Sequence, residues 1–151
     1  MLNTGISITR NIEKYNSLIN YMLSNNKFLK NKINPIFLPT DNDIKNRIKN
    51  LDVLLTYNIN KNYFNNKNNN LKWIHIGNAG VDNSLFKEVI KSNIIITNSR
   101  GINSIPVSEF VLSLILFFSK NFSDCLKFKK NKKWTQWEIA KKNETLENKT
   151  L

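Results

Sequence analysis

The sequence contains one cysteine, Cys125, and one histidine, His75, among its 151 residues. A single cysteine excludes a disulfide framework, so the composition indicates a reducing compartment and predicts a cytoplasmic location. No zinc-ligand spacing, Walker phosphate loop or Ser-His-Asp order is present, and no metal is expected. Residues 1–20 also lack the sustained apolar segment of a secretory signal peptide.

Long hydrophobic runs are missing as well. The longest apolar stretch, residues 110–118, has about half the length of a membrane span. It therefore predicts a buried helix, and no membrane partner is expected.

Arginine is scarce: only 3 of the 23 basic residues are Arg and 20 are Lys, within a net charge of +12. Together Lys, 28 Asn and 19 Ile fill 67 of the 151 positions, which indicates a compositional drift of the whole chain. A nucleic-acid surface favours arginine clustered on one face, whereas Lys here is dispersed except over residues 127–133. We expect no specific nucleic-acid partner. The alternative, a basic module built on residues 127–133, would be recognised by salt-dependent retention on DNA.

Strand-like and helix-like segments alternate along the first two thirds of the chain. This alternation predicts βαβ units and a parallel sheet, in an α/β, flavodoxin-like, doubly wound domain with five strands. In that architecture ligands bind in loops after the carboxyl ends of strands, here residues 77–82 and 98–104. The expected strands are 6–9, 34–38, 52–56, 71–76 and 94–97, the expected helices are 12–29, 43–50 and 83–91, and residues 58–70 form a weak helix or loop.

A long helix is predicted to follow over residues 106–118. It is apolar on every side, which requires burial on every side, so we expect it to lie between two layers or two domains. Glu109 in its first turn then needs a buried polar partner. Residues 122–142 are basic and predict a helix that continues into a surface excursion.

The loop Gly77-Asn78-Ala79-Gly80 has two interpretations. Backbone N–H groups turned outward after a strand form an anion site that suits a carboxylate. Alternatively, the glycines only satisfy positive φ in a tight turn.

Three other side chains are of types that carry chemistry. His75 lies within a strand and is expected to pack or cap. Arg100 either pairs with a carboxylate or phosphate or extends into solvent. Cys125, in a Lys-rich stretch without a partner thiol or histidine, is expected to be a structural or surface thiol.

Several pieces of the sequence resemble one family, the D-isomer-specific 2-hydroxyacid dehydrogenases. Residues 71–74 and 78–82 (Asn-Ala-Gly-Val-Asp) resemble the strand and the "aGVD" substrate loop of that family. Residues 96–101 resemble its "TN-x-x-G" strand end, and residues 105–112 resemble the "VAEHVLAL" start of the helix that links its two domains. Residues 149–151 resemble the "GKTL" opening of the first nucleotide-domain strand.

The resemblance implies that the backbone at Ala79 and Gly80 binds the substrate carboxylate. It also implies that Asn103 and Ser104 lie near the nicotinamide of the cofactor, NAD or NADP. No catalytic residue is carried over, because the family's GxGxxG fingerprint and its catalytic Arg, Glu and His have no counterpart here, and His75 is in the wrong position. The substrate-binding residues implied are Asn78, Ala79, Gly80 and Val81.

The same resemblance implies three parts and a larger enzyme. Residues 1–103 would form the substrate-binding domain, residues 104–133 the linking helices, and residues 134–151 an excursion and the first strand of a missing NAD-binding domain. We therefore expect a truncated chain or one part of a split gene. Full-length relatives are usually homodimers, and this chain alone is expected to bind NADH weakly and to turn nothing over.

The predicted function is the substrate-binding portion of an NAD(P)-dependent oxidoreductase that interconverts a 2-keto acid and a D-2-hydroxy acid. The resemblance extends to glyoxylate/hydroxypyruvate reductase-like and phosphoglycerate dehydrogenase-like branches. The alternative is a non-catalytic flavodoxin-like module that binds small carboxylates or partners.

Overall fold

The structure, a computed structural model, describes residues 1–64 and 70–150. It divides into two compact units, Met1–Gly101 and Ile102–Leu151, which are described separately. Of the predicted weak helix or loop over 58–70, Lys61–Phe64 form a short 3₁₀ helix, η2, whereas residues 65–69 lie outside the described residues.

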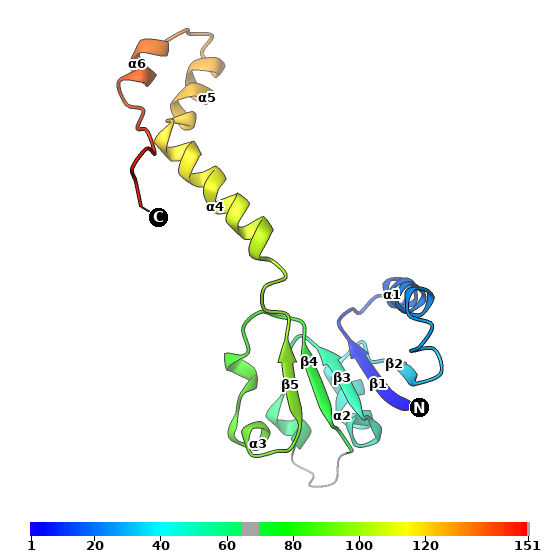
Figure 1. Cartoon of the computed structure of the whole chain (residues 1–151). Coiled ribbons are helices and arrows are strands. Elements are labelled where there is room, and N and C mark those ends of the chain that lie inside the picture. Colours follow the sequence, from blue (N-terminus) through cyan, green and yellow to red (C-terminus); the bar gives the residue numbers. More distant parts are fainter. Residues whose placement is uncertain (65–69, 151) are drawn as a thin grey trace. The chain divides into compact units, whose positions relative to one another are not determined.

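The first unit alternates strands and helices, as the sequence predicts (Figure 1). Its helices are shorter than the sequence suggests in two places. The predicted helix 12–29 ends at Asn25, and the predicted helix 83–91 is split into a 3₁₀ turn and one short helix. In chain order the elements are β1 (Leu2–Ser7), α1 (Ile12–Asn25), β2 (Ile33–Phe37), α2 (Asp41–Arg47), η1 (Ile48–Asn50), β3 (Val53–Thr56), η2 (Lys61–Phe64), β4 (Trp73–Ile76), η3 (Asp82–Ser84), α3 (Lys87–Ile90) and β5 (Ile95–Asn98).

The five strands form one parallel sheet in the order β2-β1-β3-β4-β5. This is the flavodoxin-like order, so the predicted α/β fold class is confirmed. The first strand starts earlier than predicted, because Leu2 pairs with Ile33 and the ladder runs from there to Ile6 and Phe37. All the strands are parallel, so their carboxyl ends meet at one edge of the sheet.

One face of the sheet carries the main core. Leu54, Ile74 and Ile76 on this face are fully buried beneath α2, η1 and η2. Burying side chains of this size stabilises the fold by about 1.5–3 kcal/mol each. The buried residues of this cluster are Leu38, Ile44, Ile48, Leu51, Leu54, Ile59, Tyr63, Leu71, Ile74 and Ile76.

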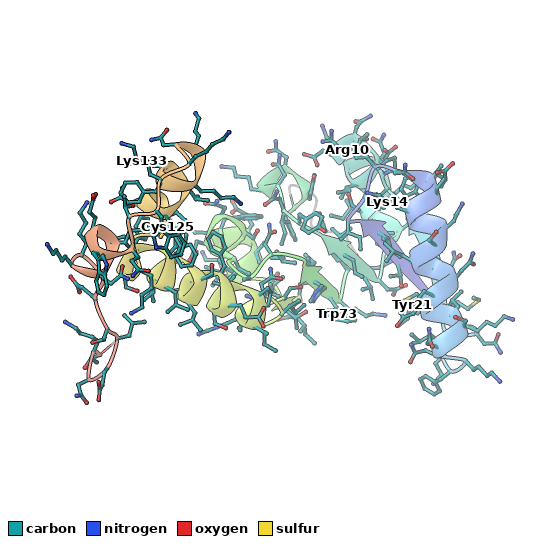
Figure 2. All side chains as sticks on the ribbon, turned by 90° about the horizontal axis from the view of Figure 1, so that it is seen from above. Arg10, Lys14, Tyr21, Trp73, Cys125 and Lys133 are labelled. Atoms are coloured by element: carbon teal, nitrogen blue, oxygen red, sulfur yellow. The ribbon has the colours of Figure 1, made fainter. Side chains whose placement is uncertain are left out.

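The opposite face is covered only in part by the described residues. Tyr15 of α1 packs on Phe37 of β2, with 4.8 Å between ring centroids. At the other end of the same face, Trp73 and Ile95 are 40% and 63% exposed. Figure 2 labels Trp73 on the sheet and Tyr21 on α1. The fifth strand, β5, therefore half-buries Ile96 and Asn98 on one face and leaves Ile95 and Thr97 exposed on the other.

The helix α2 begins two residues earlier than the predicted helix 43–50 because of its N-cap. Thr40 is the N-cap, and it forms a capping box with Asp43 in which each side chain binds the other residue's backbone N–H. The helix consequently begins at Asp41. The helix α3 starts at Lys87, and its N-cap residue Phe86 makes no side-chain cap.

The second unit contains α4 (Ser104–Ser119), α5 (Phe122–Lys130) and α6 (Gln136–Ala140). The predicted long apolar helix is present as α4, but no residue of it is buried in the structure. Glu109 is likewise exposed, so the buried polar contact expected for it is not found among the described residues. A helix with apolar side chains all around needs covering layers, and its own unit covers α4 only in part, where the Phe117 ring stacks on Phe122 of α5 with 6.0 Å between centroids.

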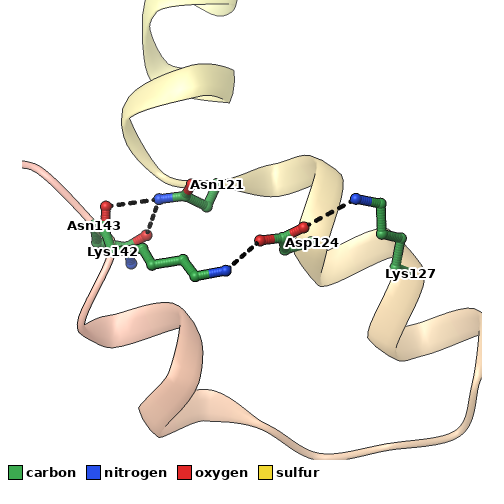
Figure 3. A network of polar contacts seen from close by, with 5 residues as sticks. All are labelled: Asn121, Asp124, Lys127, Lys142 and Asn143. Carbon is green, nitrogen blue, oxygen red and sulfur yellow. Dashed lines mark hydrogen bonds and ion pairs between the residues drawn. The ribbon is translucent and has the colours of Figure 1, made fainter.

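The connections between the helices of this unit are held by polar contacts (Figure 3). Asp124 on α5 accepts from Lys127 at 3.1 Å and from Lys142 at 3.1 Å, while Asn121 donates to the carbonyl oxygen of Lys142 at 2.8 Å. These contacts tie the segment after α6 to the start of α5. Because both lysines are largely exposed, each ion pair contributes little.

Residues 149 and 150 form no strand, and Leu151 lies outside the described residues. A strand needs a neighbouring strand to take up its backbone hydrogen bonds, and residues 102–150 contain none. No single described helix is long and apolar enough to cross a membrane; α4 and α5 together meet that test by length and composition only, as a pair bent by 64°.

Candidate functional site

The candidate substrate loop, residues 77–81, follows β4 at the carboxyl edge of the sheet. It starts at Gly77, whose N–H donates to the carbonyl oxygen of Thr56 at 2.8 Å. A Cβ atom at Gly77 would lie 2.8 Å from the ring of Tyr57. Glycine at this position is therefore explained by packing within the protein.

Two neighbouring strand ends hold the loop. On one side the Asn78 amide donates to the carbonyl oxygen of Tyr57, after β3, at 2.9 Å. On the other side the Asn98 amide, at the end of β5, donates to the carbonyl oxygen of Ala79 at 2.7 Å. The backbone N–H of Ser99 also donates to the carbonyl oxygen of Asn78 at 3.2 Å. Side chains and backbone from β3 and β5 thus fix a loop that belongs to β4.

Two loop N–H groups remain available. Among the described residues, neither the N–H of Ala79 nor that of Gly80 donates a hydrogen bond. Both residues are exposed, whereas Val81 packs against the main core. Adjacent backbone N–H groups without internal partners are suited to an anion such as a carboxylate.

Gly80 differs from Gly77 in its surroundings. A Cβ atom at Gly80 would meet only the Asp82 carboxylate, at 3.8 Å, and its φ is not positive. The interpretation that the loop glycines only satisfy positive φ is therefore wrong, since Gly101 alone among the glycines has positive φ. Neither local packing nor φ explains the missing side chain of Gly80, which leaves the backbone open to a ligand.

His75 lies on β4 and bonds to β5, so it packs as predicted. Its Nδ1 lies 2.9 Å from the Thr97 hydroxyl and its Nε2 lies 3.1 Å from the Ser99 hydroxyl. Trp73 donates to the same Thr97 hydroxyl at 2.8 Å. Both ring nitrogens are occupied by hydroxyl groups at the end of β5, which indicates a role in joining the two strands.

The other predicted residues take no part in holding this loop. Arg100 is exposed after β5 and forms no ion pair among the described residues. Asn103 is the N-cap residue of α4 but makes no side-chain cap, and Ser104 is the first residue of that helix. Cys125 is a half-buried free thiol on α5, where Figure 2 labels it together with Lys133 beyond the helix end.

The residues present do not form a dinucleotide phosphate site. Such a site needs three glycines in one G-x-G-x-x-G loop between a strand and a helix. The chain has four glycines: one lies on β1, two lie in the 77–81 loop, and Gly101 follows β5. Asn103 and Ser104 could contribute polar contacts to a nicotinamide but no phosphate cradle. No group of three or more His, Cys, Asp or Glu within the described ranges is placed to hold a metal ion.

Asn98 and Tyr57 belong to the site, although sequence reasoning missed both. Asn98 lies in the "TN-x-x-G" segment, in which only Arg100 has a charged side chain and is the obvious candidate. Tyr57 directly follows the third predicted strand, so its position at the carboxyl edge was available as a signal. Their contacts depend on which strands are neighbours, which the sequence alone does not state.

Comparison with solved structures shows that the fold of this chain occurs as a part of larger proteins. The chain is similar over 95% of its length to apo D-mandelate dehydrogenase from Rhodotorula graminis, at 16% identity and a TM-score of 0.68. It is similar over 97% of its length to the NAD-dependent formate dehydrogenase of Staphylococcus aureus in complex with NAD, at 16% identity and a TM-score of 0.64. The PH0520 protein of Pyrococcus horikoshii OT3 is 22% identical over 96% of the chain, with a TM-score of 0.64.

The chain spans less than half the length of these structures: 45%, 45% and 42%, in the same order. Among curated proteins, no match was found. The sequence does match the catalytic domain of the D-isomer-specific 2-hydroxyacid dehydrogenases over residues 11–149. Because that match takes in nearly all of its 151 residues, the chain belongs to the D-isomer-specific 2-hydroxyacid dehydrogenase family.

Proposed function

We propose that this chain supplies the substrate-binding part of an NAD(P)-dependent D-2-hydroxyacid dehydrogenase, which interconverts a small 2-keto acid and a D-2-hydroxy acid. The family membership supports the reaction class. The observation that carries the proposed role of the chain itself is the loop at Asn78–Val81, where two N–H groups have no partner among the described residues.

In this proposal the substrate carboxylate accepts hydrogen bonds from the N–H groups of Ala79 and Gly80. Backbone donors held by neighbouring strands lose little conformational freedom on binding, so they favour one orientation of the carboxylate. The absence of a Cβ atom at Gly80 lets the carboxylate approach the backbone closely. The chain therefore orients the substrate, and none of its residues is assigned a proton transfer.

The proposed cofactor is NAD or NADP, which supplies or accepts the hydride when bound. The similar enzyme from Staphylococcus aureus is described in complex with NAD. Asn103 and Ser104 are the residues of this chain proposed to lie near the nicotinamide. Since the chain has no glycine-rich phosphate loop, its proposed part in the reaction is limited to holding the substrate. The whole enzyme is proposed to be a homodimer.

Carboxylate binding at the loop is tested with the ¹⁵N-labelled chain and pyruvate as the probe. We expect pyruvate to shift the amide resonances of Ala79 and Gly80 in a saturable manner. Pyruvamide, which has the same size but no negative charge, serves as the control and should leave these resonances unchanged. Equal shifts with both compounds, or shifts confined to other residues, would contradict the proposed carboxylate site.

A further inference from the structure

The two peptide groups of the loop are oriented by the end of β5. In a planar trans peptide group, the C=O of one residue and the N–H of the next point in opposite directions. The carbonyl oxygen of Asn78 accepts from the Ser99 N–H at 3.2 Å, and that of Ala79 accepts from the Asn98 amide at 2.7 Å. Both carbonyls thus point toward β5, which turns the N–H groups of Ala79 and Gly80 away from it.

One of these two hydrogen bonds comes from the backbone of Ser99, and the other comes from the side chain of Asn98. The bond from the Ser99 N–H is a backbone contact that any residue except proline would make at that position. The bond to Ala79 comes from a side chain, and it determines the direction of the peptide group whose N–H belongs to Gly80. Without it, neither the C=O nor the N–H of this peptide group would have a hydrogen-bond partner among the described residues.

We propose that Asn98 is a positioning residue, whose amide holds the Ala79 carbonyl so that the Gly80 N–H faces the substrate carboxylate. This inference rests on the proposed carboxylate site. In this arrangement the Asn98 amide contacts the Ala79 carbonyl oxygen and not the ligand. Its half-buried position at the strand end keeps the amide within 2.7 Å of the Ala79 carbonyl oxygen.

The test compares Asn98→Ala, Asn98→Gln and the unchanged chain. In Asn98→Ala we expect greater picosecond–nanosecond mobility of Gly80 in ¹⁵N relaxation without ligand. We also expect pyruvate binding to weaken about 2- to 10-fold, the range for one hydrogen bond of ordinary net strength. Asn98→Gln retains an amide donor and should restore part of both properties.

Asn25→Ala is the matched control, since the Asn25 amide also donates to a carbonyl oxygen, that of Tyr21 at 2.8 Å in α1. It should change neither Gly80 mobility nor pyruvate binding. If Asn98→Ala leaves the relaxation of Gly80 and the pyruvate affinity as they are in the unchanged chain, Asn98 is not a positioning residue. If the unchanged chain does not bind pyruvate while Gly80 becomes mobile in Asn98→Ala, the proposed carboxylate site fails and the contact is structural only.

Discussion

At the carboxyl edge of the sheet, the residue types at positions 77 and 80 have different physical explanations. Gly77 makes room for the ring of Tyr57, whereas Gly80 has open space where its side chain would be. Two glycines three positions apart in one loop therefore serve different purposes. The first is required by packing, and for the second we propose a ligand that approaches the backbone.

Replacing these glycines should separate stability from binding. Gly80→Ala is expected to change the free energy of unfolding by no more than about 0.5 kcal/mol and to weaken pyruvate binding about tenfold, as an added methyl group in a binding site does. Gly77→Ala should instead lower stability by about 1 kcal/mol, because the half-exposed Tyr57 ring must shift. Urea unfolding and amide titration measure the two effects. Loss of stability in Gly80→Ala would contradict the assignment of open space.

Asp52 should make stability depend on pH in the acidic range. Hydrogen bonds from the Lys72 ammonium, at 3.0 Å, and then from the Asn3 backbone N–H lower the pKa of its carboxyl group. A carboxyl group whose pKa is lower in the folded state stabilises the fold above its unfolded pKa of about 3.9, and this stabilisation is lost as pH falls through the folded value.

The expected loss in Asp52→Asn at pH 7 is at most about 1 kcal/mol, the upper range for an exposed ion pair. The difference between variant and unchanged chain should shrink as the pH is lowered from about 5 toward about 2, the range in which a carboxyl group of lowered pKa takes up its proton. Urea unfolding at several pH values measures it. Glu147→Gln, which removes an exposed carboxylate that forms no ion pair among the described residues, is the control. If the difference in the free energy of unfolding stays constant over this pH range, the Asp52 charge does not contribute to stability.

At the scale of elements, α4 has an apolar surface that its own unit does not bury. Its large apolar side chains are accessible on several sides: Ile105 and Phe118 are each 71% exposed and Phe110 is 62% exposed. A contiguous apolar surface of this kind promotes association in water. We therefore expect the chain to associate as its concentration rises.

Replacing Phe110 and Phe118 together with serine should reduce this association, because both exposed rings are removed from α4. Sedimentation velocity at increasing protein concentration measures the effect. Phe28→Ser, which removes a ring that is 70% exposed in the first unit, is the matched control and should have a smaller effect. If Phe28→Ser reduced association as much as the double variant, α4 would not be the associating surface.

At the scale of the whole molecule, the first unit contains its own core. Every buried residue of the main cluster lies between Leu38 and Ile76, and all five strands belong to Met1–Gly101. A polypeptide of residues 1–101 is therefore expected to fold by itself and to unfold cooperatively in urea, followed by circular dichroism. It should also retain the pyruvate-dependent shifts of Ala79 and Gly80. A non-cooperative transition would mean that the second unit contributes to the stability of the first.

Much of the fold could be predicted from local patterns. Apolar runs of four to six residues separated by helical periodicities indicated the strands and their parallel arrangement, and the structure confirms the α/β class. Boundaries were less accurate where a side chain outside the periodic segment decides them, as Thr40 does at the start of α2. Periodicity describes what a helix needs and not what covers it, so the burial expected for α4 between two domains stays a prediction, and its own unit buries none of its residues.

The alternation of elements, the resemblance to one family and the loop at Asn78–Val81 could be predicted from the sequence, because these follow from neighbouring residues. How that loop is held depends on the folded sheet. Asn98 and Tyr57 lie about 20 residues away from it in the chain, and they reach it only because β3, β4 and β5 are adjacent in the sheet. Hydrogen bonds between strand ends depend on strand order and register, and these are properties of the folded sheet.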